Sequence, residues 1–185
     1  RKTSGNKLSR KNYNLYGSRR NKKRLPILKL DKNKEILLLS SKWKELANKH
    51  RDLTPSAFML LIDTGEYAEL APMETLPAAS SIKTAILVTT LKKVDSGLIQ
   101  WNEELQLTQD VIAGEAGWMA YQSIGTNFPI HEVATEMIRI SDNTATNLLI
   151  KKLAGINKIN QDFKAIGLER TELNEFLPDL EGTNK

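Results

Sequence analysis

Hydrophobic and polar positions repeat along this chain with two different periods, which predict a helix, a hairpin and then a series of helices. Residues 32–50 carry apolar side chains at helical spacing and are expected to form an amphipathic helix. The dense apolar run 57–63 predicts a strand, and the turn Asp63-Thr64-Gly65 leads into a second strand over about 67–70. The apolar positions of the helix are Ile36, Leu39, Trp43 and Leu46.

After Pro77 the helical period predominates. Helices are predicted over about 80–94, from Pro129 onward, over 144–153 and over 157–166, with a polar, glycine-containing stretch at 101–128. This order predicts an α/β (α+β) fold, a helical subdomain plus an antiparallel sheet whose later strands are missing from this chain. Because a lone hairpin is marginal in water, we expect the sheet to be completed by residues beyond Lys185 or by another chain.

Length and composition restrict the class of protein. The 185 residues suit one domain with a real core, and the hydrophobic (40%) and charged (26%) contents are ordinary for a globular protein. The absence of cysteine excludes disulfides and thiol chemistry, and no apolar run has the length of a membrane helix. The chain begins at Arg1 without an apolar leader, so we expect a mature or trimmed product with any export signal upstream, and an extracytoplasmic location.

The positive charge is concentrated at the N-terminus. Residues 1–34 hold thirteen Lys and Arg and one acidic residue, which leaves fourteen basic and twenty-one acidic residues in the remainder. The sequence therefore predicts a basic, flexible segment over 1–31 and a separate folded domain over 32–185. Residues 1–24 are interpreted as a solubilising linker or as an electrostatic tether to an anionic surface.

The first chemical motif is Ser80-Ser81-Ile82-Lys83 at the start of the predicted helix 80–94. Its spacing places Ser80 and Lys83 on one helix face, where a buried and neutral lysine can activate a serine nucleophile. The helix N-terminus favours an oxyanion at the same place. Ser-x-x-Lys also occurs at residues 4–7 and 41–44, but only Lys83 lies in an apolar helix.

The second motif, Ser141-Asp142-Asn143, occurs once and lies between two predicted helices. The Ser141 hydroxyl can relay a proton between Lys83 and a leaving amine. The Asn143 amide can hold both the lysine and a substrate carbonyl, and Asp142 is expected to stabilise the turn. Alone, such a motif is more typical of a helix cap than of an active site.

Together the two motifs resemble those of the class A serine β-lactamases and their penicillin-binding relatives. The flanking sequences Leu76-Pro77-Ala78-Ala79 and Thr144-Ala145-Thr146-Asn147 are similar as well, and 172–178 resembles the Ω-loop of that family. The resemblance covers roughly residues 33–185. It implies Ser80, Lys83 and Ser141 as catalytic residues, with no cofactor and no metal.

The resemblance also shows two departures from the family. The third motif, Lys-Thr/Ser-Gly, is absent and is expected beyond Lys185. The Ω-loop is short, because Gly167 stands seven residues before Asn174. Glu172 is the candidate base for deacylation, although it can instead align with a neighbouring, non-catalytic glutamate. Asn174 matches the water-positioning asparagine, and Trp118 or Tyr121 is the candidate aromatic residue at the cleft mouth.

We therefore predict a serine hydrolase that forms an acyl-enzyme at Ser80 with a β-lactam or a peptidoglycan-like peptide. The predicted substrate-binding residues are Asn143, Asn174 and Trp118, and the protein is expected to be a monomer. One alternative is a penicillin-binding protein or D-Ala-D-Ala peptidase that deacylates slowly. The other is a non-catalytic homologue that docks through its basic segment.

Overall fold

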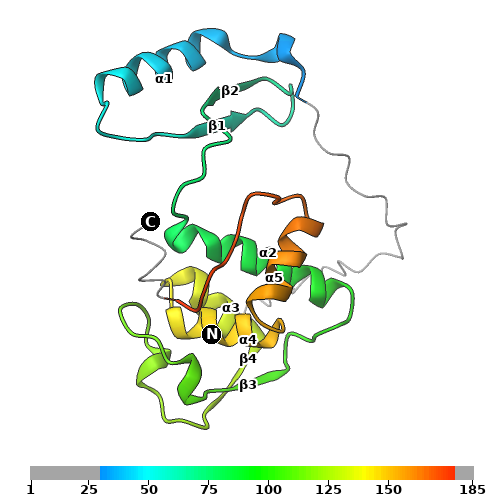
Figure 1. The fold of residues 1–185 in the computed structure, drawn as a ribbon. Coiled ribbons are helices and arrows are strands. Elements are labelled where there is room, and N and C mark those ends of the chain that lie inside the picture. The colour runs from blue at the N-terminus through cyan, green and yellow to red at the C-terminus, as the bar shows by residue number, and fades with distance from the viewer. Residues whose placement is uncertain (1–29, 178–185) are drawn as a thin grey trace, which may run out of the picture. The chain divides into compact units, whose positions relative to one another are not determined.

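The chain divides into two units between residues 30 and 31, and the computed structural model of the protein describes residues 30–177 (Figure 1). The predictions for the basic segment 1–24 and for residues after Leu177 lie outside the described residues. The functional division at residue 31 stays a prediction. In the described part, no helix is both long and apolar enough to cross a membrane.

The second unit begins with a helix and a hairpin. A short 3-10 helix, η1 (Lys32–Lys34), precedes α1 (Leu37–Lys49), and β1 (Ala57–Leu60) pairs antiparallel with β2 (Tyr67–Leu70). The single helix predicted over 32–50 is thus divided, because Glu35 is extended and forms a bridge with Tyr67. Two hydrogen bonds join α1 and its N-cap residue to β2, from the Ile36 amide to the Tyr67 carbonyl (2.7 Å) and from the Glu69 amide to Ser40 Oγ (3.1 Å).

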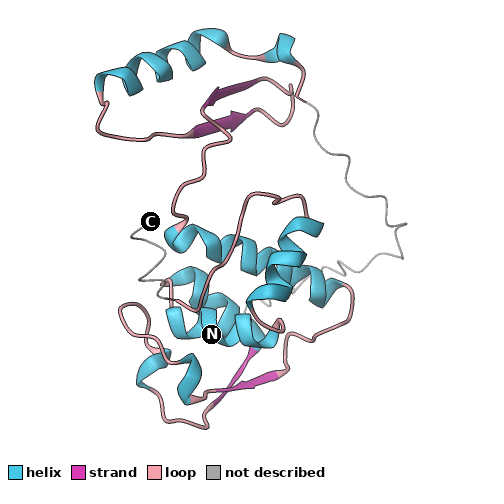
Figure 2. Cartoon of the chain, viewed as in Figure 1, coloured by secondary structure: helices cyan, strands magenta, loops and turns pink. Residues whose placement is uncertain are grey.

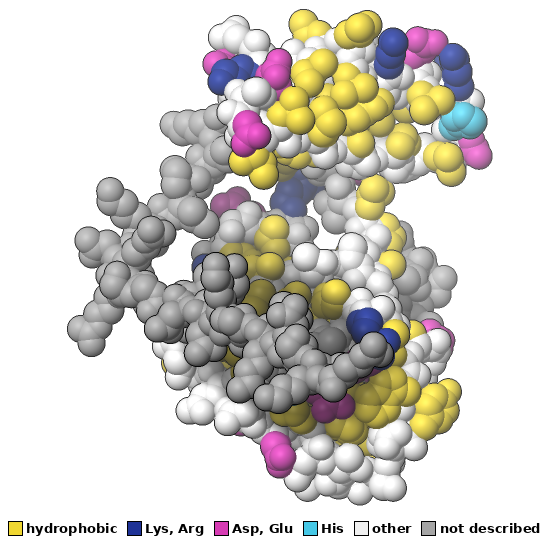
Figure 3. Space-filling model, turned by 180° about the vertical axis from the view of Figure 1, so that it is seen from behind, with side chains coloured by type: hydrophobic (Ala, Val, Ile, Leu, Met, Phe, Trp, Pro, Cys, Tyr) yellow, Lys and Arg dark blue, Asp and Glu magenta, His cyan; other side chains and the backbone are white. Residues whose placement is uncertain are grey.

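Strand β1 corresponds to the strand predicted over 57–63. Among the described residues it pairs with β2 alone, and it ends at Leu60, earlier than the predicted residue 63. Phe58 is 49% exposed and Ile62 is 89% exposed. Figure 3 shows hydrophobic side chains gathered over the part of the molecule formed by α1, β1 and β2.

Four helices form the main hydrophobic core. They are α2 (Ile82–Asp95), α3 (Ile130–Arg139), α4 (Asn143–Lys152) and α5 (Ile156–Ala165) (Figure 2). The predicted helices agree with them within about two residues, because each apolar stripe faces the common core. Residues buried in that core include Ile86, Met137, Leu149, Ile159 and Phe163.

The stretch 101–128, for which the sequence predicted only a polar, glycine-containing segment, contains regular elements. Within it and at its end, β3 (Glu104–Gln106) pairs antiparallel with β4 (Asn127–Pro129), and two 3-10 helices, η3 (Gln109–Val111) and η4 (Met119–Tyr121), lie between them. Leu105 and Phe128 are partners in this small sheet, and both are buried. Strands of three residues are too short to produce a recognisable alternating pattern.

Candidate active site

Ser80 lies at the junction between a tight turn and a long helix. It belongs to the 3-10 helix η2 (Ala79–Ser81), and α2 begins two residues later. Ala79, immediately before it, has a φ of +44°, a conformation that costs a non-glycine residue of the order of 1–3 kcal/mol. Ser80 is exposed, whereas Ile82 and Ile86 of the same segment are buried. The helix is therefore anchored by its apolar face, with the serine presented at its solvent end.

Lys83 is almost completely buried, with an exposed fraction of 2%. Its Nζ donates to the Ser141 carbonyl oxygen (2.6 Å), to Ser141 Oγ (2.9 Å) and to Asn143 Oδ1 (2.7 Å). Burial lowers the pKa of Lys83 below its ordinary value, and the nearby charge of Asp142 opposes this effect. The lysine is thus closer to the neutral form that a general base requires than an exposed lysine would be.

Ser141 connects Lys83 to Ser80. Its Oγ accepts from Lys83 and donates to Ser80 Oγ across 2.9 Å. An ammonium group has three N–H donors, and the three acceptors around Lys83 use all of them. A neutral amine has a lone pair instead of the third donor, and the Ser141 hydroxyl is the only one of these three acceptors that carries a hydrogen to donate to it. The protonation state of Lys83 therefore sets the direction of the bond between Ser141 and Ser80.

Asp142 stabilises the turn, as predicted. Its Oδ1 accepts from the Ala145 amide and so caps α4, while its Oδ2 accepts from the amides of Trp118 and Met119 (2.8 and 3.0 Å). A side chain at Gly117, whose φ is +96°, would bring a Cβ into collision with Asp142 Oδ2. Glycine at that position is what allows the carboxylate to approach the loop so closely.

Asn143 is held between Lys83 and the loop that precedes η4. Its Oδ1 accepts from Lys83, its Nδ2 donates to the Gly114 carbonyl (3.2 Å), and its backbone amide donates to the Ala116 carbonyl (3.2 Å). The residue is buried yet lines the cleft next to Ser80. One amide hydrogen thus serves the protein, and the second is available chemically for a substrate carbonyl.

Ser80 lines a cleft of about 1080 Å³. One wall is formed by residues 72–82, and the other includes residues 170–174 together with Glu115 and Asn143. Glu172 and Asn174 line this cleft, as their predicted roles require. Glu172 is exposed, and its carboxylate lies 3.8 Å from Lys164 Nζ, so the described structure pairs it with α5 and not with Ser80.

Two asparagines that the sequence interpretation did not identify hold the segment 171–177. The Asn147 side chain accepts from the Leu177 amide and donates to the Leu177 carbonyl, both at 2.8 Å. Asn160 does the same for Leu173, at 2.8 and 2.9 Å. The signal for Asn147 was a polar residue inside a helix that is buried along its length, since α4 buries every residue from 143 to 150.

Trp118 does not line the cleft described above. Its indole N–H donates to Glu136 Oε2 (2.7 Å), and its ring meets Phe128 edge-on with centroids 5.8 Å apart. Its predicted role in substrate binding stays a prediction, and the observed contacts tie the residue to α3 and β4 instead. Tyr121, the other candidate, is 81% exposed.

The described side chains offer no group of three or more His, Cys, Asp or Glu residues arranged to hold a metal ion. The polar groups gathered beside the Ser80 hydroxyl are the Ser141 hydroxyl and, behind it, the Lys83 amine and the Asn143 amide.

Comparison with known proteins places this geometry in context. The model of a family described as the beta-lactamase enzyme family matches residues 38–185. Among curated proteins, beta-lactamase BRO-1 of Moraxella catarrhalis is 28% identical over 151 residues, which cover 78% of this chain and 44% of that protein. A beta-lactamase of Bacillus licheniformis is 27% identical over 125 residues, covering 66% and 40%.

Solved structures of PBP-A and of a class A beta-lactamase are similar to this chain as well. The structure of PBP-A is 39% identical and superposes with a TM-score of 0.78 over 80% of this chain and 56% of PBP-A. An ancestral class A beta-lactamase (GNCA) is 25% identical, with a TM-score of 0.66 over 76% of this chain and 53% of its own. The chain thus spans about half the length of the relatives it matches.

Proposed function

The chain belongs to the beta-lactamase enzyme family, with a class A β-lactamase-like fold, and on that basis we propose that the complete protein forms an acyl-enzyme with β-lactams at Ser80. The observation that carries the proposal is the hydrogen-bonded line from Lys83 through Ser141 to Ser80. It supplies a base, a relay and a nucleophile in one geometry, with the nucleophile exposed to a cleft.

In the proposed acylation, neutral Lys83 accepts the proton of the Ser141 hydroxyl, and Ser141 accepts that of Ser80. The Ser80 oxygen attacks the lactam carbonyl carbon and forms a C–O bond. The ring C–N bond then breaks, and the proton returns from Lys83 through Ser141 to the departing nitrogen. Asn143 holds Lys83 through Oδ1 and offers an N–H to the substrate carbonyl.

Deacylation requires an activated water, and the proposed base is Glu172, with Asn174 positioning the water. Both residues line the cleft. Glu172 would have to leave Lys164, which costs little because exposed ion pairs are worth about 0–1 kcal/mol. On this proposal the protein hydrolyses β-lactams, but weakly.

The pairing of Glu172 with Lys164 also favours a second candidate function, a penicillin-binding protein that deacylates slowly. The likeness to PBP-A supports this alternative, and a mutant of PBP-A forms an acyl-enzyme complex with penicillin G. The substrate would then be a D-Ala-D-Ala-like peptide. The extracytoplasmic location, the monomeric state and an anionic partner for residues 1–24 stay predictions in either case.

Rapid-mixing kinetics with a chromogenic cephalosporin tests the proposal on the complete protein. We expect a burst of one ring opened per enzyme and then a slower steady rate. Ser80→Ala should abolish the burst. The matched control is Ser81→Ala, because that neighbouring hydroxyl donates within its own turn to the Ala78 carbonyl. A burst that survives in Ser80→Ala would contradict the proposal, as would a wild type without one.

A further inference from the structure

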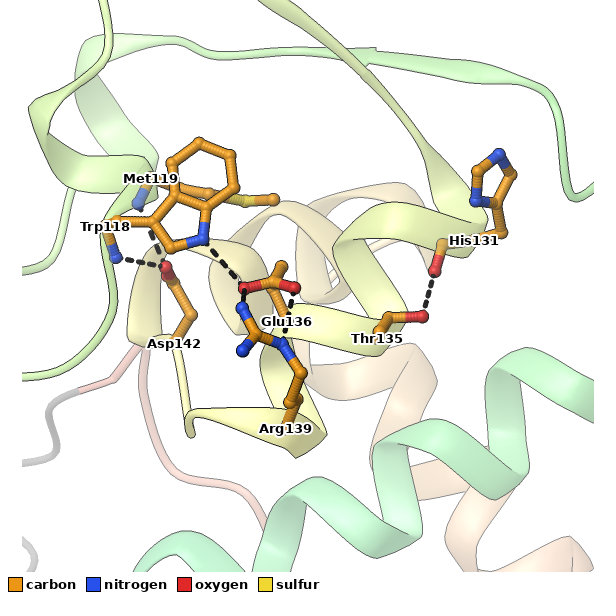
Figure 4. Close-up of polar contacts among 7 residues, drawn as sticks. All are labelled: Trp118, Met119, His131, Thr135, Glu136, Arg139 and Asp142. Carbon is orange, nitrogen blue, oxygen red and sulfur yellow. Dashed lines mark hydrogen bonds and ion pairs between the residues drawn. The ribbon is translucent and has the colours of Figure 1, made fainter.

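Glu136 is an almost buried carboxylate that takes no part in the proposed proton transfer. It lies in α3 and is 7% exposed. Figure 4 shows it between Trp118 and Arg139. Its Oε2 accepts from the Trp118 indole N–H (2.7 Å) and from Arg139 Nη2 (2.6 Å), and its Oε1 accepts from Arg139 Nε (3.0 Å). Hydrogen bonds from Arg139 and Trp118 lower the pKa of Glu136, so it is charged at neutral pH.

Trp118, whose indole is hydrogen-bonded to Glu136, belongs to the loop 114–119, and backbone amides of this loop bind the Asp142 carboxylate. The Trp118 and Met119 amides both donate to Asp142 Oδ2, and Figure 4 shows these three residues together on one side of the network. The Asp142 amide in turn donates to the Glu136 carbonyl oxygen (3.3 Å). Glu136 therefore contacts this turn twice, through its backbone directly and through its side chain by way of Trp118.

Asp142 stands between the two residues that surround Lys83. Ser141 precedes it with a φ of +61°, a conformation that a serine adopts only when its surroundings impose it. Asn143 follows it and is held by the Gly114 and Ala116 carbonyls of the same loop. A small displacement of this loop would move all the acceptors of the Lys83 amine together.

We propose that Glu136 and Trp118 are positioning residues that fix the loop 114–119 against Asp142 and so hold Ser141 and Asn143 in register with Lys83. This inference rests on the proposed function of the Ser80 site, to which it adds two residues that do not touch the substrate. Neither residue lines the cleft. Their loss should therefore lower the rate of acylation, which depends on Lys83, Ser141 and Asn143 together, more than the affinity for the β-lactam, to which only Asn143 of these three contributes.

The test uses two variants of the complete protein that remove the contact from opposite sides. Trp118→Phe deletes the indole N–H while keeping a ring against Phe128, and Glu136→Ala deletes the carboxylate. Because a hydrogen bond to a charged group is worth about 1.5–3 kcal/mol, we expect the acylation rate constant to fall about ten- to hundredfold, with a smaller change in the dissociation constant of the initial complex. Glu136→Gln keeps an acceptor for the indole and should restore most of the rate.

A purely structural role would lower the melting temperature without changing the chemistry. The control for it is Asp162→Asn, which removes another partly buried carboxylate, paired with Lys93 and Lys158. We expect this variant to melt earlier but to be acylated at the wild-type rate. If Trp118→Phe and Glu136→Ala behave in the same way as Asp162→Asn, the inference is wrong.

A second readout needs no acylation. NMR titration of the ¹³Cε resonance of Lys83 reports the pKa of its amine. Burial is the larger influence on that pKa and the Asp142 charge the smaller. Loosening the turn should therefore raise the pKa of Lys83 toward its ordinary value in Trp118→Phe, but not in Asp162→Asn. An unchanged titration in Trp118→Phe overturns the inference. A wild type without acylation at Ser80 overturns the proposed function, and the titration then decides the inference alone.

Discussion

Ser141 donates its hydroxyl hydrogen to Ser80 across 2.9 Å, although the two residues are 61 positions apart in the chain. The same oxygen accepts from Lys83, also at 2.9 Å. With a protonated lysine the bond points toward Ser80, and with a neutral lysine it points back toward Lys83. One line of three atoms can therefore carry a proton in both directions, as an acyl transfer requires.

We predict that removal of the Ser141 hydroxyl slows acylation by about 10²–10⁴-fold, the usual contribution of a positioned acid or base. The measurement is the rate of covalent labelling by a fluorescent penicillin. Because Ser141 has a φ of +61°, Ser141→Gly relieves backbone strain that Ser141→Ala retains. Equal deficits in the two variants would assign the effect to the hydroxyl. Wild-type labelling in both would exclude the relay.

The lowered pKa of Lys83 predicts the pH dependence of acylation. Acylation needs the neutral amine, so its rate should rise with pH and then level off. The midpoint of this rise should lie at a pKa below the 10.5 that is ordinary for lysine. This rise of the acylation rate with pH should be absent in Lys83→Arg, since arginine stays protonated throughout. Labelling rates between pH 5 and 10 test this, and a rate that falls with rising pH would show that the neutral lysine is not the base.

Glu172→Gln separates the two candidate functions. If Glu172 activates the deacylating water, the variant should acylate nearly as fast as the wild type but lose about 10²–10⁴-fold in turnover. If the protein instead deacylates slowly without that base, the wild type already gives one burst and little turnover. Burst and steady-state rates of both proteins decide between these outcomes. Rapid and equal turnover in the two would remove Glu172 from the mechanism.

Asn160 should contribute more to the stability of the fold than an ordinary surface residue, because its side chain pairs with both the backbone N–H and the backbone carbonyl of Leu173. We predict that Asn160→Ala lowers the free energy of unfolding by about 1–3 kcal/mol, the cost of leaving such groups unpaired, and increases protease cleavage within 168–177. Asn157→Ala, an exposed position on the same helix, is the control. Equal stability of the two variants would show that the hydrogen bonds between Asn160 and Leu173 do not stabilise the fold.

The sequence predicted the four main helices and the group Ser80, Lys83, Ser141 and Asn143, because helical periodicity places a motif at a known end of an element. The conformations that complete the site were not predictable in the same way. The left-handed backbone at Ala79 and Ser141 has no residue signature, since neither is glycine. Periodicity also says nothing about which side chains a loop will meet, so the contact of Trp118 with Glu136 required the structure.

The course of the segment 168–177 shows the same limit. Its sequence placed Glu172 and Asn174 near the site, and the structure does place both along the cleft. The Glu172 carboxylate is paired with Lys164 of α5, and the segment is held by hydrogen bonds from Asn160 of α5 and Asn147 of α4. Those contacts span thirteen and thirty positions of sequence, beyond the reach of a local pattern.

Locating the acyl adduct by mass spectrometry tests the central claim most directly. After reaction of the complete protein with penicillin G and rapid digestion, we predict the added mass on the peptide that contains Ser80, and fragment ions that place it on Ser80 and not on Ser81. Ser80→Ala should carry no adduct. An adduct on any other residue, or none on a folded and complete wild type, would contradict the assignment of Ser80 as the nucleophile.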